Sequence, residues 1–290
     1  MTKEYFTVLA SRGVILLDGA TGSNLRESGM PVGVSPELWI LEHPEIMLEL
    51  QSAYVDAGSQ IICAPTFSAN RRSLKHFGLE EKTDELNRNL VALSKRASAG
   101  KALIAGDLSS MGQPLEPIGP LPYSVAYDIY REQMEALVSA GVDLLTIETL
   151  MGIDEAAAAL DAASSFDIPV FCSFSVEADG GVMFGGTAQE AALTAQEMGA
   201  SAVGVNCSVG PDQLESVIRS IKSAVSIPVI AKPNAGLPTM DEAGHAHYSM
   251  GPSDFVRHMD ILLTAGAGIV GGCCGTTPEY IRQLSALLQR

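Results

Sequence analysis

The sequence predicts a single domain, covering residues 1–290, that folds as a (β/α)8 (TIM) barrel. Two observations lead to this prediction. Eight short, nearly continuous apolar segments recur along the chain, which is typical of strands that are buried on both faces. Segments with the spacing of amphipathic helices lie between them, and several end in glycine, a helix-stop signal. No change in composition marks a second domain.

The predicted elements alternate from one end of the chain to the other. The strands are expected at residues 14–18, 60–64, 102–106, 143–148, 169–174, 202–206, 228–232 and 268–271. The clearest helices are expected at residues 44–57, 84–99, 124–140, 187–198 and 280–288. Thr187 and Glu190 have the spacing of a capping box at the start of one helix. A doubly wound sheet is disfavoured, because no Gly-x-Gly-x-x-Gly motif follows the first strand.

The composition of the chain disfavours several classes of binding partner. The chain has 34 acidic and 18 basic residues and a formal charge of -16, which disfavours nucleic acids and anionic membrane surfaces. The longest weakly polar stretch, 261–274, is too short to span a bilayer, and the N-terminus lacks a signal-peptide pattern. Five cysteines are too few for a disulfide framework. We therefore expect a cytoplasmic protein whose thiols stay reduced.

Polar residues that can carry chemistry cluster at the carboxyl ends of the predicted strands. In a barrel these ends converge on one face, and the long predicted loops 22–42, 109–122 and 234–251 would build a pocket there. The set consists of Asp18, Thr66, Asp107, Glu148, Asn206, Cys207, Asn234, Cys273 and Cys274. The sequence therefore predicts a site at the carboxyl-terminal mouth of the barrel.

Two adjacent cysteines, Cys273 and Cys274, follow the last predicted strand and are flanked by glycines. Vicinal cysteines are poor disulfide partners, because one peptide link brings their Cα atoms closer than a disulfide needs. The flanking glycines allow the backbone to bend so that both thiols face one site. Cys207 ends the sixth strand, with one strand between it and the pair. Three thiolates with one open tetrahedral position are typical of catalytic zinc.

The motifs that contain these residues resemble the homocysteine S-methyltransferase family, most closely the homocysteine-binding module of the cobalamin-dependent methionine synthases. They span almost the whole chain and read Asp18-Gly19-Ala20-Thr21-Gly22, Thr66-Phe67-Ser68-Ala69-Asn70, Glu148-Thr149-Leu150, Gly204-Val205-Asn206-Cys207, Pro233-Asn234-Ala235-Gly236-Leu237-Pro238 and Gly271-Gly272-Cys273-Cys274-Gly275-Thr276-Thr277-Pro278. The resemblance implies one zinc ion held by Cys207, Cys273 and Cys274, with the thiol of homocysteine in the fourth position.

The resemblance also implies a reaction and a set of substrate contacts. Three thiolates give a zinc site a net charge of about -1, so a substrate sulfur stays nucleophilic and attacks an activated methyl group, giving methionine. Asp18 and Glu148 would bind the ammonium group of homocysteine, and backbone amides around Gly19 its carboxylate. Thr66 and Asn234 would also line the substrate pocket. The alternative for Asn234 is that it occupies the open zinc position when substrate is absent.

The sequence leaves the methyl donor and two other function classes open. The Gly275–Glu279 segment and the Pro-Asn-Ala-Gly motif are most similar to corrinoid-linked enzymes, which implies methylcobalamin on a separate module or protein. Relatives that use S-methylmethionine or betaine share the zinc motif. One other class is a barrel whose glycine-rich eighth strand binds a phosphate ligand while the cysteines merely pack. The other is a homocysteine-binding subunit whose catalysis belongs to a partner. Cys63 and Cys172 are expected to be core residues.

Overall fold

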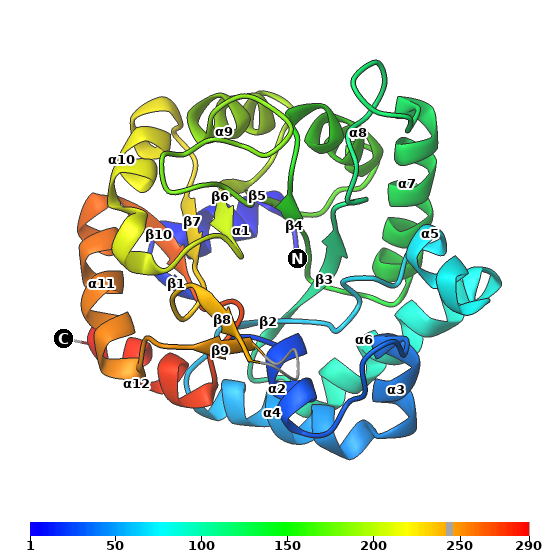
Figure 1. Cartoon of the computed structure of the whole chain (residues 1–290), viewed down its shortest axis with the longest axis horizontal. Helices are drawn as coiled ribbons and strands as arrows, with labels where there is room; N and C mark the ends of the chain where they lie inside the picture. The colour runs from blue at the N-terminus through cyan, green and yellow to red at the C-terminus, as the bar shows by residue number, and fades with distance from the viewer. Residues whose placement is uncertain (242–245, 290) are drawn as a thin grey trace.

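The computed structural model describes residues 1–241 and 246–289, which form the predicted barrel. Eight parallel strands make one sheet in the order β1-β10-β7-β6-β5-β4-β3-β2, and helices surround it (Figure 1). Strands β1 and β2 are joined through Gln60, whose N–H donates to Leu16 O at 2.8 Å and whose Oε1 accepts from Leu16 N at 2.9 Å. The sheet is therefore a nearly closed barrel.

All eight predicted strands are present. They are β1 (Ile15–Leu16), β2 (Ile61–Cys63), β3 (Leu103–Ser109), β4 (Leu144–Leu150), β5 (Val170–Phe174), β6 (Ala202–Asn206), β7 (Val229–Lys232) and β10 (Ala267–Val270). Every residue of β2, β5, β6 and β7 is buried, which explains why these segments read as continuous apolar runs.

Besides α2 and α3, which are described below, the helices that follow the strands are α4 (Pro44–Asp56), α5 (Arg71–Leu74), α6 (Thr83–Ser98), α7 (Tyr123–Ser139), α8 (Ile153–Ala163), α9 (Ala188–Glu197), α10 (Glu215–Ala224), α11 (Pro252–Ala265) and α12 (Pro278–Leu288). The capping box of Thr187 and Glu190 at the start of α9 is confirmed. The helix-stop glycines Gly141 and Gly199 have φ values of 78° and 91°. Within residues 1–241 and 246–289, no helix is long and apolar enough to cross a membrane.

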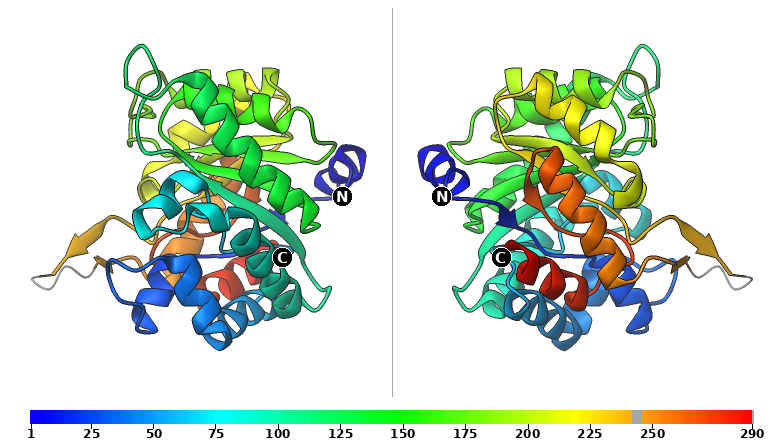
Figure 2. Two further views of the ribbon diagram at one scale, coloured as in Figure 1. Left: turned by 90° about the vertical axis from the view of Figure 1, so that its right-hand side faces the viewer. Right: turned by 90° about the vertical axis from the view of Figure 1, so that its left-hand side faces the viewer.

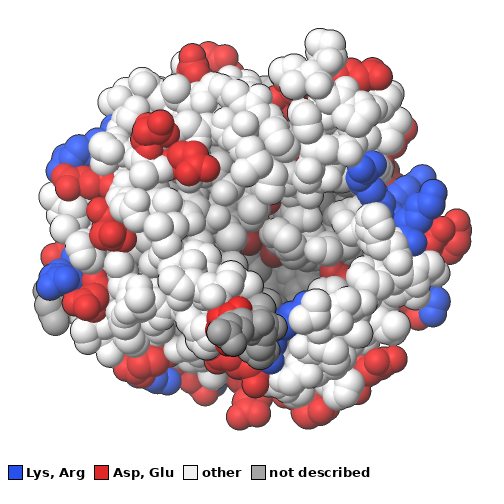
Figure 3. Space-filling view, in the orientation of Figure 1, with Lys and Arg blue, Asp and Glu red and all other residues white. Residues whose placement is uncertain are grey.

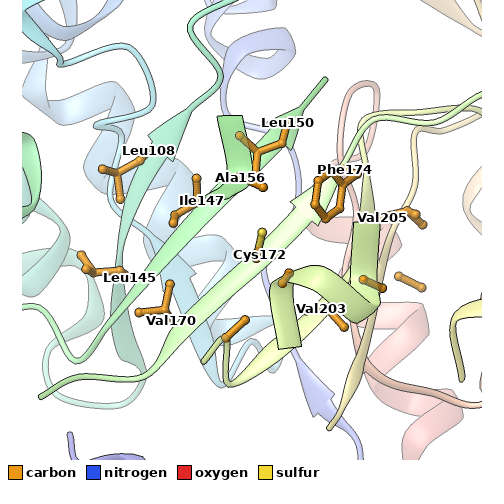
Figure 4. Close-up of a cluster of buried hydrophobic side chains, with 14 of the residues drawn as sticks. Leu108, Leu145, Ile147, Leu150, Ala156, Val170, Cys172, Phe174, Val203 and Val205 are labelled. Atoms are coloured by element: carbon orange, nitrogen blue, oxygen red, sulfur yellow. The ribbon is translucent and has the colours of Figure 1, made fainter. Parts of the chain in front are cut away.

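Strand residues contribute to two apolar clusters. Inward-facing strand residues such as Ile61 and Phe171 fill the amino-terminal part of the barrel. Helix α1 (Lys3–Ala10) closes this end by packing Phe6 against Phe171 in a tilted arrangement, with the ring centroids 5.0 Å apart. Outward-facing strand residues pack under the helices, as Figure 4 shows for β3 to β6. Cys172 lies in this outer layer and is fully buried, so its predicted core role is confirmed. The carboxyl-terminal part of the interior is left for polar side chains.

The loops at the carboxyl-terminal end contain more regular structure than the sequence reading expected. The segment predicted as a loop over residues 22–42 contains helices α2 (Gly22–Glu27) and α3 (Pro36–Glu42). That expectation was wrong because Ser35 caps α3, with Oγ accepting from Leu38 N, and Pro36 occupies its first turn. The segment after β7 forms an antiparallel hairpin of β8 (Pro238–Met240) and β9 (Ala246–Tyr248). Figure 2 shows that hairpin at the opposite end of the molecule from α1.

Candidate metal and substrate site at the barrel mouth

Three cysteines meet at the carboxyl-terminal mouth of the barrel. The sulfur atoms of Cys207, Cys273 and Cys274 all lie within 4.8 Å of one another, and the Cys207 and Cys274 sulfurs are 3.5 Å apart. Cys207 follows β6, and the pair follows β10. All three side chains are half-buried, so the cluster can be reached from the pocket.

The backbone after β10 is fixed by hydrogen bonds to its neighbours. The N–H of Gly272 donates to Asp18 O at 3.0 Å, and the N–H of Cys273 donates to Pro233 O at 2.8 Å. A Cβ on Gly272 would lie 2.3 Å from Thr276 Oγ1, so this close turn requires glycine. Because these N–H groups are already satisfied, they cannot hold a phosphate group. The geometry therefore disfavours a phosphate-binding eighth strand.

Asn206 holds two strained residues in place. Thr149 and Cys207 have φ values of 61° and 46°, a region that L-residues seldom adopt. The Asn206 Oδ1 accepts from Thr149 N at 2.7 Å and from the Ser173 hydroxyl at 2.8 Å, while its Nδ2 donates to Thr149 Oγ1 at 2.8 Å. This network ties the Glu148-Thr149 turn on β4 to the residue that precedes Cys207. It therefore couples the β4 side of the mouth, with Glu148, to the cysteine cluster.

The cysteine cluster fits a soft divalent ion. Tetrahedral zinc with Zn–S distances of about 2.3 Å needs sulfur atoms about 3.8 Å apart, and the cluster needs little adjustment to reach this spacing. Thiolate ligands favour zinc over magnesium or calcium. Hydrogen bonds from Cys207 and Cys273 lower the pKa of Cys274 to about 3, so one thiolate is favoured. The donor set and its spacing therefore suit a metal ion.

Tyr248, in strand β9 of the hairpin after β7, contacts the cysteine cluster. The ring of Tyr248 packs on Gly275, where a Cβ would lie 2.2 Å from Tyr248 Cγ. Burial, the charge of Cys274 and a hydrogen bond to its sulfur all raise the pKa of Tyr248. Sequence reasoning missed this residue, because a tyrosine in a glycine-rich loop gives no signal of its contacts.

A buried ion-pair network lies at the mouth and is centred on Lys232, at the end of β7. Its Nζ is 3.0 Å from Glu148 Oε2, 3.9 Å from Asp18 Oδ1 and 3.7 Å from the Cys63 sulfur. Burial alone would lower the pKa of Lys232, but Cys63, Glu148 and Asp18 raise it well above its usual value. Sequence reasoning also missed Lys232, which reads as the last residue of a buried strand.

The predicted substrate residues Asp18 and Glu148 are both buried in this network. Burial raises the pKa of Asp18 to about 6, and Lys232 and the Cys63 N–H oppose that rise. Burial likewise raises the pKa of Glu148, and Lys232 opposes it. Cys63, expected as a core residue, is buried and donates its N–H to Asp18 Oδ2 at 2.7 Å. The structure thus brings both predicted carboxylates to one cation.

The other predicted residues take different places around the mouth. The fully buried Thr66 accepts from Asp107 N at 3.1 Å and donates to Asp107 O at 2.9 Å, so it holds strand β3. Gly19 packs under Tyr54, where a Cβ would lie 2.7 Å from the Tyr54 hydroxyl. Asn234 donates to Ser208 O at 2.7 Å, and its buried Oδ1 has no protein partner in the described part of the chain.

The mouth is a hollow with acidic groups inside and a mostly uncharged rim. Figure 3 shows red carboxylate surface within the central depression, while most Lys and Arg residues lie toward the periphery. The acidic floor suits a ligand that carries a positive group.

A model of the family described as homocysteine S-methyltransferase matches residues 15–288, which is nearly the whole chain. The chain belongs to this family. The match identifies it as a methyltransferase, as its motifs implied.

Curated relatives are similar to the chain over nearly its whole length, and solved structures share its fold. The chain is 27% identical to methionine synthases of Mycobacterium leprae and Mycobacterium tuberculosis, over 99% and 98% of its length. It spans 25% of the length of each of these relatives. The metallated form of the homocysteine methyltransferase MmuM from Escherichia coli superposes with a TM-score of 0.79 at 23% identity, covering 97% of this chain and 98% of that one.

More distant barrels share only the fold. The carboxyl transferase domain of pyruvate carboxylase from Rhizobium etli superposes with a TM-score of 0.55 at 13% identity, covering 98% of this chain and 48% of that one. At this level of identity, and at that of MmuM, the likeness shows the fold alone. The family assignment therefore rests on the family match.

Proposed function

We propose that this chain binds homocysteine at a zinc site and transfers a methyl group to its sulfur, giving methionine. The observation that carries the proposal is the meeting of Cys207, Cys273 and Cys274 at the barrel mouth of a homocysteine S-methyltransferase family member. The longer methionine synthase relatives support the identity of substrate and product.

In this proposal the residues of the chain hold, orient and shield the substrate. Zinc, when bound by the three cysteines, would supply a Lewis acid that keeps a substrate thiol deprotonated at neutral pH. The side-chain hydrogen bonds of Asn206 fix the end of β6, so the sulfur of Cys207, the next residue, is in place before substrate enters. The Asp18, Glu148 and Lys232 network forms a charged floor for an amino acid. Backbone amides around Gly19 are the proposed contacts for its carboxylate end, and Asn234 is proposed to line the pocket.

We further propose that the methyl donor is a corrinoid carried on a separate module or protein. The methionine synthase relatives are much longer than the matched region, which leaves room for a carrier in those proteins. Exposed apolar side chains also occur on the four segments that follow β1, β3, β5 and β7, on the carboxyl-terminal side of the barrel. They are Val32, Ile118, Met183, Leu237 and Met240, with exposures of 87%, 71%, 61%, 54% and 65%. An apolar rim suits contact with a large carrier rather than a small charged donor.

The metal part of the proposal is tested by the zinc content of purified protein. We expect about one zinc ion per chain in the wild type and a large loss in Cys207→Ala. The matched control is Cys172→Ala, which removes a fully buried cysteine in the outer core and should keep the metal. Wild-type protein without zinc, or full zinc in Cys207→Ala, would contradict the proposed site.

The donor is tested by methionine formation from homocysteine with zinc-loaded protein. Methylcobalamin, S-methylmethionine and betaine are supplied in separate reactions. Turnover with methylcobalamin alone supports the corrinoid proposal. Turnover with either of the other donors would overturn that donor assignment while leaving homocysteine methylation in place. Zinc and thiol binding without turnover would support a subunit that needs a protein partner.

A further inference from the structure

The hydroxyl of Tyr248 is a hydrogen-bond donor beside the cysteine cluster, where it bonds to the sulfur of Cys274. The sulfur of Cys207, by contrast, forms its hydrogen bonds with the other two cysteines. Hydrogen bonds between cysteines need a thiol proton, and metal binding removes that proton. A phenol keeps its proton at neutral pH, so the bond from Tyr248 would persist in the metal-bound site.

The ring of Tyr248 lies against the backbone that follows Cys274. A Cβ on Gly275 would clash with Tyr248 Cγ, and Gly275 has a φ of 83°, so glycine alone leaves room for the ring here. The N–H of Gly275 donates to Ser23 Oγ at 3.1 Å, which holds this turn. The packing therefore fixes the ring beside the sulfur that its hydroxyl meets.

The chain just beyond Tyr248 is also held in place, through Met250. The N–H of Met250 donates to Ala235 O at 3.2 Å, and its carbonyl accepts from the Tyr280 hydroxyl at 2.6 Å. The N–H of Ala235 donates in turn to Cys274 O at 2.9 Å. Backbone hydrogen bonds thus connect the end of β9 to Cys274, in addition to the contact between the two side chains.

A donor to one ligand sulfur has a chemical consequence in a thiolate site. With three cysteines and a substrate thiol bound to one metal ion, four sulfur atoms would be nucleophiles for one methyl group. A hydrogen bond to a thiolate stabilises its negative charge, and a sulfur whose charge is stabilised is a weaker nucleophile. The bond from Tyr248 therefore lowers the reactivity of Cys274 relative to a sulfur without such a donor.

We propose that Tyr248 is a positioning residue that holds the Cys274 sulfur as a metal ligand and protects it from methylation. This inference rests on the proposed function and concerns selectivity for the substrate sulfur. In the side reaction that is suppressed, a lone pair of the Cys274 sulfur forms the new S–C bond. The bond between the methyl group and its donor breaks, and the donor leaves with that electron pair. The hydrogen bond from Tyr248 engages the sulfur electron density that this attack needs.

The test measures alkylation of each cysteine by iodomethane, with iodide as the leaving group, in protein kept in excess zinc. Peptide mass spectrometry resolves the sites. Tyr248→Phe keeps the ring and loses the hydroxyl, so we expect Cys274 to react about 10-fold faster than in the wild type. The rate at Cys207, whose sulfur bonds within the cluster, should change by less than about threefold. Zinc affinity, measured by competition with a chelator, should fall about 10-fold.

The matched control is Tyr123→Phe, which removes a hydroxyl that links α7 to α8 by donating to Asp161 Oδ2 at 3.3 Å. It should leave the alkylation rates and the zinc affinity unchanged. The melting temperature of zinc-free Tyr248→Phe should match that of the wild type, because the residue is only half-buried and keeps its ring. A lower melting temperature without faster alkylation of Cys274 would show a merely structural role and contradict the inference.

Two further results would overturn the inference. If Cys274 in Tyr248→Phe reacts at the wild-type rate, the hydroxyl does not protect the sulfur. If Tyr248→Ala raises that rate and Tyr248→Phe does not, the ring covers Cys274 and the hydrogen bond has no role. Wild-type protein that binds no zinc contradicts the proposed function itself, whereas zinc-loaded protein with equal rates in wild type and variant refutes this inference alone.

Discussion

Replacing Lys232 by methionine tests whether the buried network at the mouth is electrostatic. Methionine has nearly the same length and shape but no charge. At an effective dielectric constant of about 20, the attractions over 3.0 Å to Glu148 and 3.9 Å to Asp18 are about 5 and 4 kcal/mol. Desolvation of the ions offsets much of this. Removing one partner of a buried pair typically destabilises by about 3–5 kcal/mol, which is the loss that we expect at pH 7.

The loss should depend on pH in a defined direction. The carboxyl of Asp18 has a pKa raised to about 6 by burial, and Lys232 lowers the pKa of both Asp18 and Glu148. Without the lysine, both folded-state pKa values rise further. An acid with a raised folded-state pKa contributes stability below its unfolded pKa and loses it as pH rises through the folded value. Lys232→Met should therefore be destabilised more at pH 8 than at pH 5.

The assay is urea unfolding at pH 5, 7 and 8, followed by circular dichroism. Lys75→Met is the control, since Lys75 is exposed and its replacement should change the unfolding free energy by less than about 0.5 kcal/mol. If Lys232→Met lost less than about 1 kcal/mol at pH 7 and showed no pH trend relative to wild type, the ion-pair reasoning would be refuted.

Two further predictions concern the scaffold of the site. Asn206→Ala removes three hydrogen bonds, two to Thr149 and one to Ser173, beside Cys207. We expect zinc affinity to fall about 10-fold or more and the free energy of unfolding to fall by about 3 kcal/mol. Ser173→Ala, which removes one of those bonds, should cost about 1 kcal/mol, and equal zinc affinity in both variants would contradict a positioning role for Asn206. Gly204→Ala should prevent soluble expression, because its Cβ would lie 2.0 Å from the carbonyl oxygen of Ile230; a folded variant with wild-type melting would show that β6 and β7 can separate there.

Much of the fold was predictable because strand burial and helix periodicity are local properties of the sequence. Each of the eight apolar segments became a strand, and the helix-stop glycines and the Thr187 capping box appeared where they were expected. The errors fell in predicted loops: helices α2 and α3 lie in 22–42, and the strands β8 and β9 lie in 234–251. Short helices of six and seven residues carry little periodic signal, so the usable sign was the Ser35 cap of α3.

The candidate site, like the fold, was predictable from the sequence only in part. The sequence by itself determined that Cys207, Cys273 and Cys274 would end two strands of one barrel, because strand ends are visible in the apolar pattern and a barrel gathers them at one mouth. Only the tertiary structure decided how the charges pair there. Lys232 is the last residue of β7. Nothing local distinguishes a lysine that joins two carboxylates from one that faces water. Which charged side chains pair depends on which ones point into the barrel at the same level along its axis. That level is set by the register between strands that are far apart in the sequence.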